Sequence, residues 1–357
     1  LLALALSPQV GAASGGGPVA YGGPGVPAAA DTIYVDTGAS GVGDGSSWTG
    51  AYTSLQDALQ EARTNGQSDA VWVAAGTYHP DVGSSVASDD RTASFKITSG
   101  IDLRGHFEGT ESSLEERNLS RGAPKTILSG EIQQDGNASN NAYTVLTVEG
   151  GMAGEIHVTE GNANGSGTQG RGGGVRISDG TLHHAVLTDN RARRGAALVA
   201  TGSPALEVIR ATGNHATKNG ALHFRDDATT AEHLTVADNT AGSGANGLKV
   251  INSDATIGAL AAGPNTTTEV TRLDTTDVST VRAGQGLYDG GYPNSIDSLQ
   301  VSTKDTTYVA SIPGDVPYPK NQGDVTLKLL DTGYIPTWTL SDDAPDPTVS
   351  NPSSFVK

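Results

Sequence analysis

The chain of 357 residues contains no cysteine. Disulfide bonds, thiolate metal sites and cysteine nucleophiles are therefore excluded, and stability has to come from packing and hydrogen bonding alone. Aromatic residues are scarce, at 5% of the chain, and long runs of Leu, Glu and Lys do not occur. Positive charge is the minority sign, with 22 Lys and Arg against 39 Asp and Glu. The resulting net charge of −17 disfavours nucleic acid and anionic membranes as partners.

Glycine is abundant, at 48 residues, and Thr, Ser, Asp and Asn recur throughout. This composition is typical of many short strands joined by tight turns. One segment differs, because Leu55, Ala58, Leu59 and Ala62 are spaced to form one apolar face of a helix. Ser54 with Asp57 predicts the start of this helix, and Asn65-Gly66 predicts its end. We expect a short helix that caps a larger β core.

From residue 173 the sequence repeats with spacings of 24, 25 and 26 residues between successive asparagines. Each repeat predicts two strands whose alternating apolar residues face an interior. The predicted inward residues of the first strand are Val175/Ile177, Ala197/Val199, Leu222/Phe224 and Leu248/Val250. Those of the second strand are Leu182/Ala185/Leu187, Leu206/Ile209/Ala211 and Ala231/Leu234/Val236. Because one repeat cannot bury these residues alone, stacked coils are expected, and the pattern predicts an all-β, single-stranded parallel β-helix, that is, a solenoid.

The stretch "TGNHATKNG", residues 212–220, allows two interpretations. In one, His215 and Lys218 join Arg193 and Arg194 of the preceding coil in a cationic rim for an acidic polysaccharide. In the other, the asparagines at one-coil spacing, Asn190, Asn214 and Asn239, stack as a structural ladder in turns, with each Asn in left-handed backbone. The in-register recurrence favours the ladder.

Several segments resemble a known group of proteins: "IYVDTGASGVGDGSSWTGAYTSLQDAL", "VWVAAGTYHP", "GIDLRGHFEGTESS", "PKTILSGEI" and the "DNRARRG"-type repeats. They are similar to right-handed parallel β-helix proteins of the pectin-lyase-like superfamily, in particular its secreted bacterial type, over roughly residues 31–290. The resemblance implies a right-handed coil. The motifs describe caps, turns and coils, so they are specific for fold and weak for activity.

Pectate lyases of this fold use a basic residue to abstract a proton and carboxylates to bind Ca²⁺ on an outward strand face. In this chain the resemblance implies Lys218, His223 or Arg225 as the base, and Asp226 and Asp227 as Ca²⁺ ligands. The predicted outward row of the first strand is Arg176, Leu198, His223 and Lys249. A solvated turn explains the "RDD" string equally well, since the equivalent positions one coil away offer few carboxylates.

Three further histidines invite a metal interpretation: His183, His184 and His233. His184 and His233 occupy equivalent positions two coils apart, a separation of about 10 Å at the usual strand spacing. That is too far for one ion, so we expect outward histidines on a strand.

The chain divides into four predicted regions. They are an apolar and Gly/Pro-rich arm at 1–30, an N-terminal cap with the first coils at 31–130, β-helix repeats at 131–290, and final coils, cap and tail at 291–357. The start, "LLALALSPQV", resembles the end of a secretory signal and is too short to span a bilayer, which predicts a secreted or cell-surface protein.

Between residues 173 and 260 the coils have Phe224 as their single aromatic residue, whereas glycan sites usually stack sugars on aromatic faces. The sequence therefore favours a structural or adhesive protein over an enzyme. Its expected partners are other copies of itself, joined head to tail into filaments through the arm, or a surface polysaccharide. The alternative is a Ca²⁺-dependent polysaccharide lyase or a glycoside hydrolase acting on an acidic polysaccharide, and a non-catalytic glycan binder is a third possibility.

Overall fold

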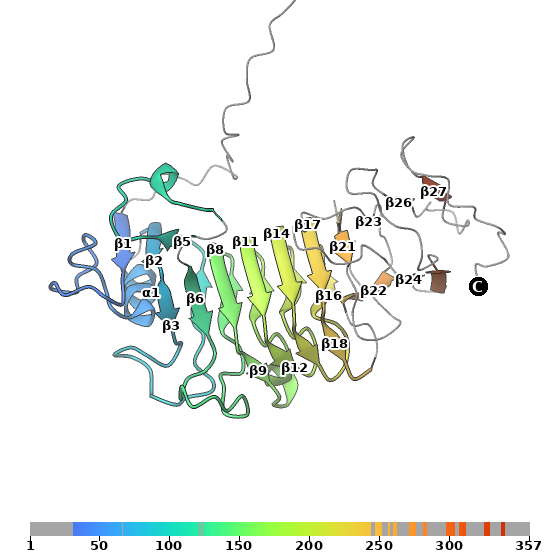
Figure 1. The fold of residues 1–357 in the computed structure, drawn as a ribbon, viewed down its shortest axis with the longest axis horizontal. Helices are drawn as coiled ribbons and strands as arrows, with labels where there is room; N and C mark the ends of the chain where they lie inside the picture. Colours follow the sequence, from blue (N-terminus) through green and yellow to red (C-terminus); the bar gives the residue numbers. More distant parts are fainter. Residues whose placement is uncertain are drawn as a thin grey trace, which may run out of the picture.

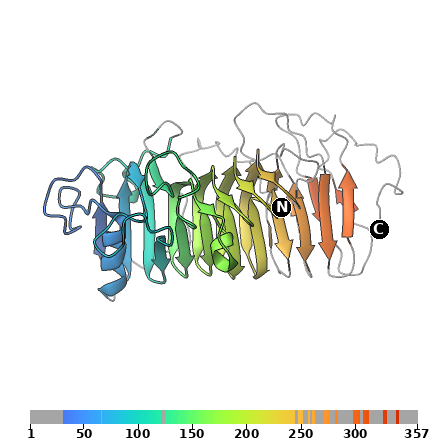
Figure 2. The same cartoon turned by 90° about the horizontal axis from the view of Figure 1, so that it is seen from below.

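The computed structural model describes residues 31–65, 67–120, 123, 125–243 and 247–251, and beyond them the backbone of strands β20–β27. The predicted arm at residues 1–30 lies outside the described residues. The described chain is mostly β-structure, with parallel strands gathered in stacked sheets and one α-helix. The strands follow the sequence along the long axis of the molecule, from α1 and β1 at one end (Figures 1 and 2).

The helix α1 spans Leu55–Thr64. Its first turn is capped by Ser54, whose side-chain oxygen accepts a hydrogen bond from the backbone N–H of Asp57, and Asn65 is the C-cap. The apolar face, Leu55, Ala58, Leu59 and Ala62, is buried and packs with strands β1, β2 and β4. Two short 3₁₀ segments are also present, η1 at Leu114–Glu116 and η2 at Gly167–Gly170.

The strands form three sheets. The 14-stranded sheet contains β1 (Asp31–Val35), β2 (Asp69–Ala74), β3 (Gly76–Tyr78), β5 (Ile101–Phe107), β6 (Thr126–Ser129), β8 (Met152–Thr159), β11 (Thr181–Thr188), β14 (Ala205–Thr212), β17 (Thr230–Ala237), β20 (Thr256–Ile257), β21 (Leu260–Ala262), β23 (Val281–Ala283), β26 (Val325–Lys328) and β27 (Thr337–Thr339). The nine-stranded sheet contains β4 (Phe95–Thr98), β7 (Leu146–Glu149), β10 (Val175–Ser178), β13 (Leu198–Gly202), β16 (Leu222–Asp227), β19 (Leu248–Ile251), β22 (Thr271–Thr275), β24 (Ser298–Thr303) and β25 (Thr307–Ser311). The four-stranded sheet contains β9 (Asn162–Ala163), β12 (Arg191–Ala192), β15 (His215–Ala216) and β18 (Thr240–Ala241).

From β7 to β18 the chain visits the nine-stranded, the 14-stranded and the four-stranded sheet in that order, four times in succession. Each strand pairs in parallel with its counterpart one repeat away, as in Leu182 with Leu206 and Leu206 with Ala231. The paired aliphatic side chains form one continuous buried cluster. This arrangement of stacked parallel sheets is compatible with a β-helix. The parallel pairing gives way to antiparallel pairing at β24–β25, β23–β26 and β26–β27.

For the second strand of each repeat, which lies in the 14-stranded sheet, the predicted inward positions agree with the observed register. For β13 in the nine-stranded sheet, the observed register differs from the predicted one by one residue. Val175 pairs with Leu198, and Ile177 pairs with Ala200. The inward residues of β13 are therefore Leu198 and Ala200, and the prediction of Val199 as inward was wrong. Ala197, which precedes β13, is buried in the core as expected. The outward row consequently runs through Arg176, Val199, His223 and Lys249.

A second correction concerns the turns. The asparagines themselves are not in left-handed backbone. The left-handed residue is the one that precedes each asparagine, namely Asp189, Gly213 and Asp238, with φ of 55°, 70° and 55°. Asp, Asn and Gly all tolerate this conformation, so the sequence did not distinguish the two residues of each pair.

A left-handed residue also interrupts each long strand of the 14-stranded sheet. These residues are Glu155, His184, Val208 and His233, with φ between 47° and 55°. The interruption explains why the apolar residues of this strand are spaced as apolar–x–x–apolar before alternation resumes. No helix in the described part of the chain has the length and apolar character needed to cross a membrane.

Candidate functional site

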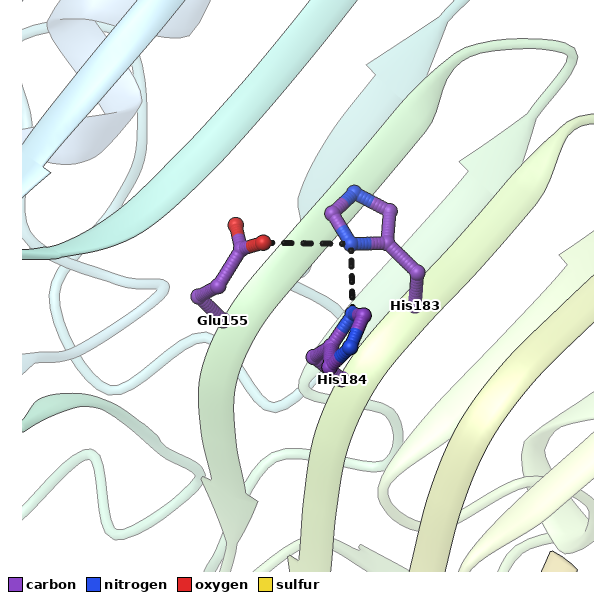
Figure 3. Close-up of side chains that lie close together, drawn as sticks. All are labelled: Glu155, His183 and His184. Atoms are coloured by element: carbon purple, nitrogen blue, oxygen red, sulfur yellow. Dashed lines mark hydrogen bonds and ion pairs between the residues drawn. The ribbon is translucent and has the colours of Figure 1, made fainter. Parts of the chain in front are cut away.

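A cluster of two histidines and a glutamate lies on the 14-stranded sheet (Figure 3). Glu155 comes from β8, and His183 and His184 come from the neighbouring strand β11. Nδ1 of His183 lies 3.4 Å from Oε1 of Glu155 and 3.4 Å from Nδ1 of His184. All three donor atoms lie within 4.8 Å of one another. The imidazole nitrogen of His183 thus occupies the middle of the cluster.

Gly154 makes room for His183. The two residues are register partners on β8 and β11. A Cβ atom built on Gly154 would lie 1.9 Å from Cε1 of His183, so the ring occupies the space that any other residue's side chain would fill. His183 is consequently only 4% exposed, although it is not part of the apolar core cluster. The expectation of outward histidines did not foresee this burial. His184 is half-buried and His233 is exposed.

Two arginines and a second carboxylate surround Glu155. Nη1 of Arg117, which follows η1, lies 3.1 Å from Oε2, and Nη1 of Arg104 on β5 lies 3.6 Å from Oε1. Arg104 also donates from Nε to Asp102 over 2.7 Å. Arg117 is fixed from several sides, because it donates to the backbone oxygens of Leu114 and Gly105 and its guanidinium lies over the ring of Phe107.

The electrostatics keep Glu155 ionised. Burial alone would raise the pKa of this carboxyl, but the hydrogen bond and charge of His183 and the charges of Arg117 and Arg104 outweigh burial and lower the pKa to about 2. Burial also lowers the pKa of His184, against the attraction of Glu155. A carboxylate and a neutral imidazole are the protonation states that bind a cation.

The hydrogen-bonding capacity of His183 is not fully satisfied. A ring nitrogen carries at most one hydrogen, so Nδ1 either shares that hydrogen between Glu155 and His184 or turns a lone pair toward the carboxylate. The other ring nitrogen, Nε2, is buried without a hydrogen-bond partner. Nδ1 of His106, whose pKa responds to the charge of Glu155, is likewise buried without a partner. Buried polar groups in this condition cost stability and therefore point to a function.

A second feature, on the nine-stranded sheet, includes several residues singled out in the sequence. His223 on β16 is 2% exposed, and neither of its ring nitrogens has a hydrogen-bond partner. Burial, followed by the positive charges of Lys249, Arg225, Arg194 and Arg171, lowers its pKa to about 3. We call Arg171, Arg176, Arg194, Arg225 and Lys249 the basic face.

The basic face is local. The segment from residue 171 to residue 225 contains eight Lys and Arg but only three Asp and Glu, whereas the whole chain has a net charge of −17. Arg176 and Lys249 lie in the same outward row as His223. All five cations of the face are half-buried.

Of the other described residues predicted for catalysis or metal binding, the structure places only Arg225 close to His223. Arg225 acts on His223 electrostatically, whereas Lys218 is an exposed turn residue between β15 and β16. The side chains of Asp226 and Asp227 lie outside the described residues, so their assignment as Ca²⁺ ligands stays a prediction. His223 is too buried for its ring to meet a substrate as the chain is folded here.

The three asparagines form a hydrogen-bonded column. Nδ2 of Asn190 donates to Oδ1 of Asn214 over 3.1 Å, and Nδ2 of Asn214 donates to Oδ1 of Asn239 over 3.0 Å. The backbone N–H groups of Gly161, Asn190 and Asn214 donate to the side-chain oxygen one repeat further on. All three asparagines are at most 1% exposed, so they satisfy buried backbone groups at a corner of the fold. The neighbouring residues His215 and Lys218 stand outside this column and are exposed.

Sequence reasoning missed Glu155, Arg104 and Arg117. The adjacent pair "HH" at residues 183–184 was visible, and Glu155 stands one repeat earlier, in "EIHV". Extending the repeat back to β8 would have placed Glu155 opposite His184, since both occupy the left-handed position of their strands. Nothing in the repeat indicates Arg117, because it lies in the connection between β5 and β6.

Comparisons with protein-family models, with curated proteins and with solved structures each found no match to this chain. The resemblance to β-helix proteins therefore rests on the quoted sequence segments and on the stacked parallel sheets. Any activity has to be argued from the two clusters described above.

Proposed function

We propose that the chain is a secreted or cell-surface structural protein, a right-handed parallel β-helix of the pectin-lyase-like type, which adheres to acidic polysaccharide through its basic face. The fold part of the proposal is supported by the recurring order of the three sheets and by the parallel in-register pairing of successive repeats. Such a rod presents one row of side chains per strand position at a spacing of about 4.8 Å, which suits a linear polymer.

The observation that carries the adhesive role is the set of four cations acting on His223. Cations gathered on one face add up their attraction for a negatively charged polymer that lies against it. The chain as a whole is acidic, so the basic face is the part of its surface to which a polyanion is attracted. The low pKa of His223, about 3, means that this ring is neutral at physiological pH and that the arginines and Lys249 provide the charge.

A binding experiment tests the adhesive role. Affinity for polygalacturonate is measured at increasing NaCl concentration, with neutral dextran as the reference polymer. We expect binding at low salt that weakens as salt rises. Replacing both Arg176 and Lys249 by Ser should lower the affinity about thirtyfold, because each contact to an anion at a partly buried site is worth about 1 kcal/mol. The matched control is Arg210→Ser on β14, which removes an exposed cation from the other large sheet. Equal losses in both proteins, or equal binding of dextran, would reject the proposal.

The alternative function is cleavage of the same class of polymer, by a Ca²⁺-dependent lyase or a hydrolase mechanism. It is favoured by the position of Arg225 within the basic face, next to the Asp226-Asp227 pair. Incubation with polygalacturonate and Ca²⁺ distinguishes the two functions, because a lyase produces unsaturated ends that absorb in the ultraviolet and a hydrolase produces new reducing ends. Binding without either product supports adhesion. Product that disappears in Arg225→Ala but persists in Lys218→Ala would assign the base to Arg225.

Self-assembly through residues 1–30 is a separate part of the proposal. It is supported by the apolar character of "LLALALSPQV" and by the general tendency of sheet ends to pair with further strands. Electron microscopy of the full chain and of a variant lacking residues 1–30 tests it. Filaments formed by the full chain and absent from the shortened chain are expected, and filaments that persist unchanged would contradict it.

A further inference from the structure

The cluster on the 14-stranded sheet has a donor set that suits a transition-metal ion. Two imidazole nitrogens and one carboxylate oxygen are typical ligands of Zn²⁺ and of its neighbours in the first transition row. Ca²⁺ prefers six to eight oxygen ligands and does not fit. We propose that Glu155, His183 and His184 form a binding site for a divalent transition-metal ion.

The distances match this chemistry. Two ligands placed about 2.1 Å from a tetrahedral Zn²⁺ are about 3.4 Å apart. The Glu155–His183 and His183–His184 donor pairs are each separated by 3.4 Å. The third pair lies within 4.8 Å, so a small side-chain rotation closes the triangle. The donor atoms point toward one another rather than away, as Figure 3 shows.

A metal ion also resolves the conflict at Nδ1 of His183. With a cation between the three groups, Nδ1 of His183 needs no hydrogen and no longer has to be shared between Glu155 and His184. The imidazole then carries its hydrogen on Nε2, the tautomer normally found in a histidine bound through Nδ1. The ring is already held in place by the space over Gly154, so little side-chain freedom is lost on binding.

The surrounding charges set the strength of the site. Arg117 binds the far oxygen of Glu155, Oε2, whereas Oε1 lies 3.4 Å from Nδ1 of His183 and 3.6 Å from Nη1 of Arg104. Arg104 is shared with Asp102, so the two arginines are balanced by two carboxylates. A further carboxylate is nearby, because Glu207 is the register partner of His183 on β14 and acts electrostatically on His184. The arginines oppose a cation, so we expect micromolar rather than nanomolar affinity.

The chain contains a matched control for this site. Glu232 and His233 are adjacent on β17, two repeats from His183 and His184 in the same sheet, and both are exposed. His233 has the same left-handed backbone as His184. The pair therefore reproduces the residue types and backbone geometry without the buried third ligand.

The test is metal binding to the full chain, prepared without a histidine tag and stripped with a chelator. Calorimetric titration with Zn²⁺ should give one ion per chain, and titration with Ca²⁺ should give none at this site. Glu155→Gln and His184→Gln should each lose at least tenfold in Zn²⁺ affinity, whereas Glu232→Gln with His233→Gln should lose less than twofold. Unfolding temperatures measured without metal show whether each variant is folded.

A second measurement in the unaltered protein covers the case in which a variant does not fold. During the Zn²⁺ titration, the side-chain NMR signals of His183 and His184 should shift together, and those of His215 and His233 should not. The proposal is overturned if Zn²⁺ binds only at millimolar concentration, if the control double variant loses as much affinity as His184→Gln, or if the signals of His183 and His184 do not respond. Its failure would leave the role of the basic face untouched, because that face lies on the other large sheet.

Discussion

The imidazole of His183 lies directly over the α-carbon of Gly154, its register partner on the neighbouring strand, where a Cβ atom would approach Cε1 to 1.9 Å. The absence of one side chain on β8 thereby provides the space for the central residue of the cluster on β11. This relationship makes Gly154 part of the site although it has no functional group, and it leads to a first prediction.

Gly154→Ala should destabilise the fold and displace His183. The added methyl group overlaps a buried ring that cannot swing away freely, and overpacking of this kind costs about 1–3 kcal/mol. Chemical denaturation measures the loss in the free energy of unfolding, and the Zn²⁺ affinity should fall with it. Gly38→Ala is the control, because its Cβ would meet only the side chain of Asp36 at 3.4 Å. A loss in Gly154→Ala no larger than in Gly38→Ala would contradict the close approach.

Asn214 should be the most sensitive position of the asparagine column. Its side chain accepts from the backbone and amide of Asn190 and donates to Leu187, so replacement by Ala leaves several buried polar groups without partners. Each such group costs about 1–3 kcal/mol, and we expect a total loss of about 3 kcal/mol in the free energy of unfolding. The neighbouring exposed residue provides the comparison, since His215→Ala should change stability by no more than about 0.5 kcal/mol. Similar effects of the two substitutions would show that the column contributes little.

The sequence predicts the inward residues of a strand only where polar residues interrupt the apolar ones. In the strand of Leu182, Ala185 and Leu187, the polar pair at 183–184 separates Leu182 from the other apolar residues, and the predicted inward positions agree with the register. In β13 and the residues before it, five consecutive positions from 196 to 200 are all apolar, so alternation defines no phase. Backbone pairing with β10 and β16 settles the register there, and that information is not local.

The candidate site was less predictable than the fold, because its residues come together only through pairing between strands that are distant in the sequence. Glu155 and His183 are 28 residues apart and meet only because β8 and β11 pair in one register. Arg117 reaches them from a connection that does not obey the repeat. The sequence-based prediction against a metal compared only His184 with His233, which are two repeats apart. It did not consider Glu155 on the strand before the two adjacent histidines.

The low pKa of Glu155 predicts an acid-sensitive contribution to stability. Because folding lowers this pKa from 4.5 to about 2, the folded state binds fewer protons than the unfolded state between these values. The contribution, about 3 kcal/mol, is therefore present above pH 5 and is lost as the pH falls toward 2. The free energy of unfolding of the unaltered protein should drop more steeply over this range than that of Glu155→Gln, so the two curves converge in acid. Glu232→Gln, at an exposed carboxyl, should run parallel to the unaltered protein, and a parallel curve for Glu155→Gln would refute the assignment.

His223 should remain neutral far below the pH at which an ordinary histidine is protonated. Burial and then four of the five cations of the basic face lower its pKa to about 3, so its NMR signal should not titrate between pH 5 and 8. A histidine-containing model peptide provides the reference signal, because an unperturbed imidazole titrates within that range. The folded state binds fewer protons at His223 than the unfolded state from about pH 6.5 downward, so stability is lost as the pH falls through this range. His223→Gln should reduce that loss, and Lys249→Ser should raise the pKa of His223 because one of the repelling charges is gone. A signal for His223 that titrates between pH 5 and 8 would mean that the ring is exposed to solvent and that the cations of the basic face do not act on it.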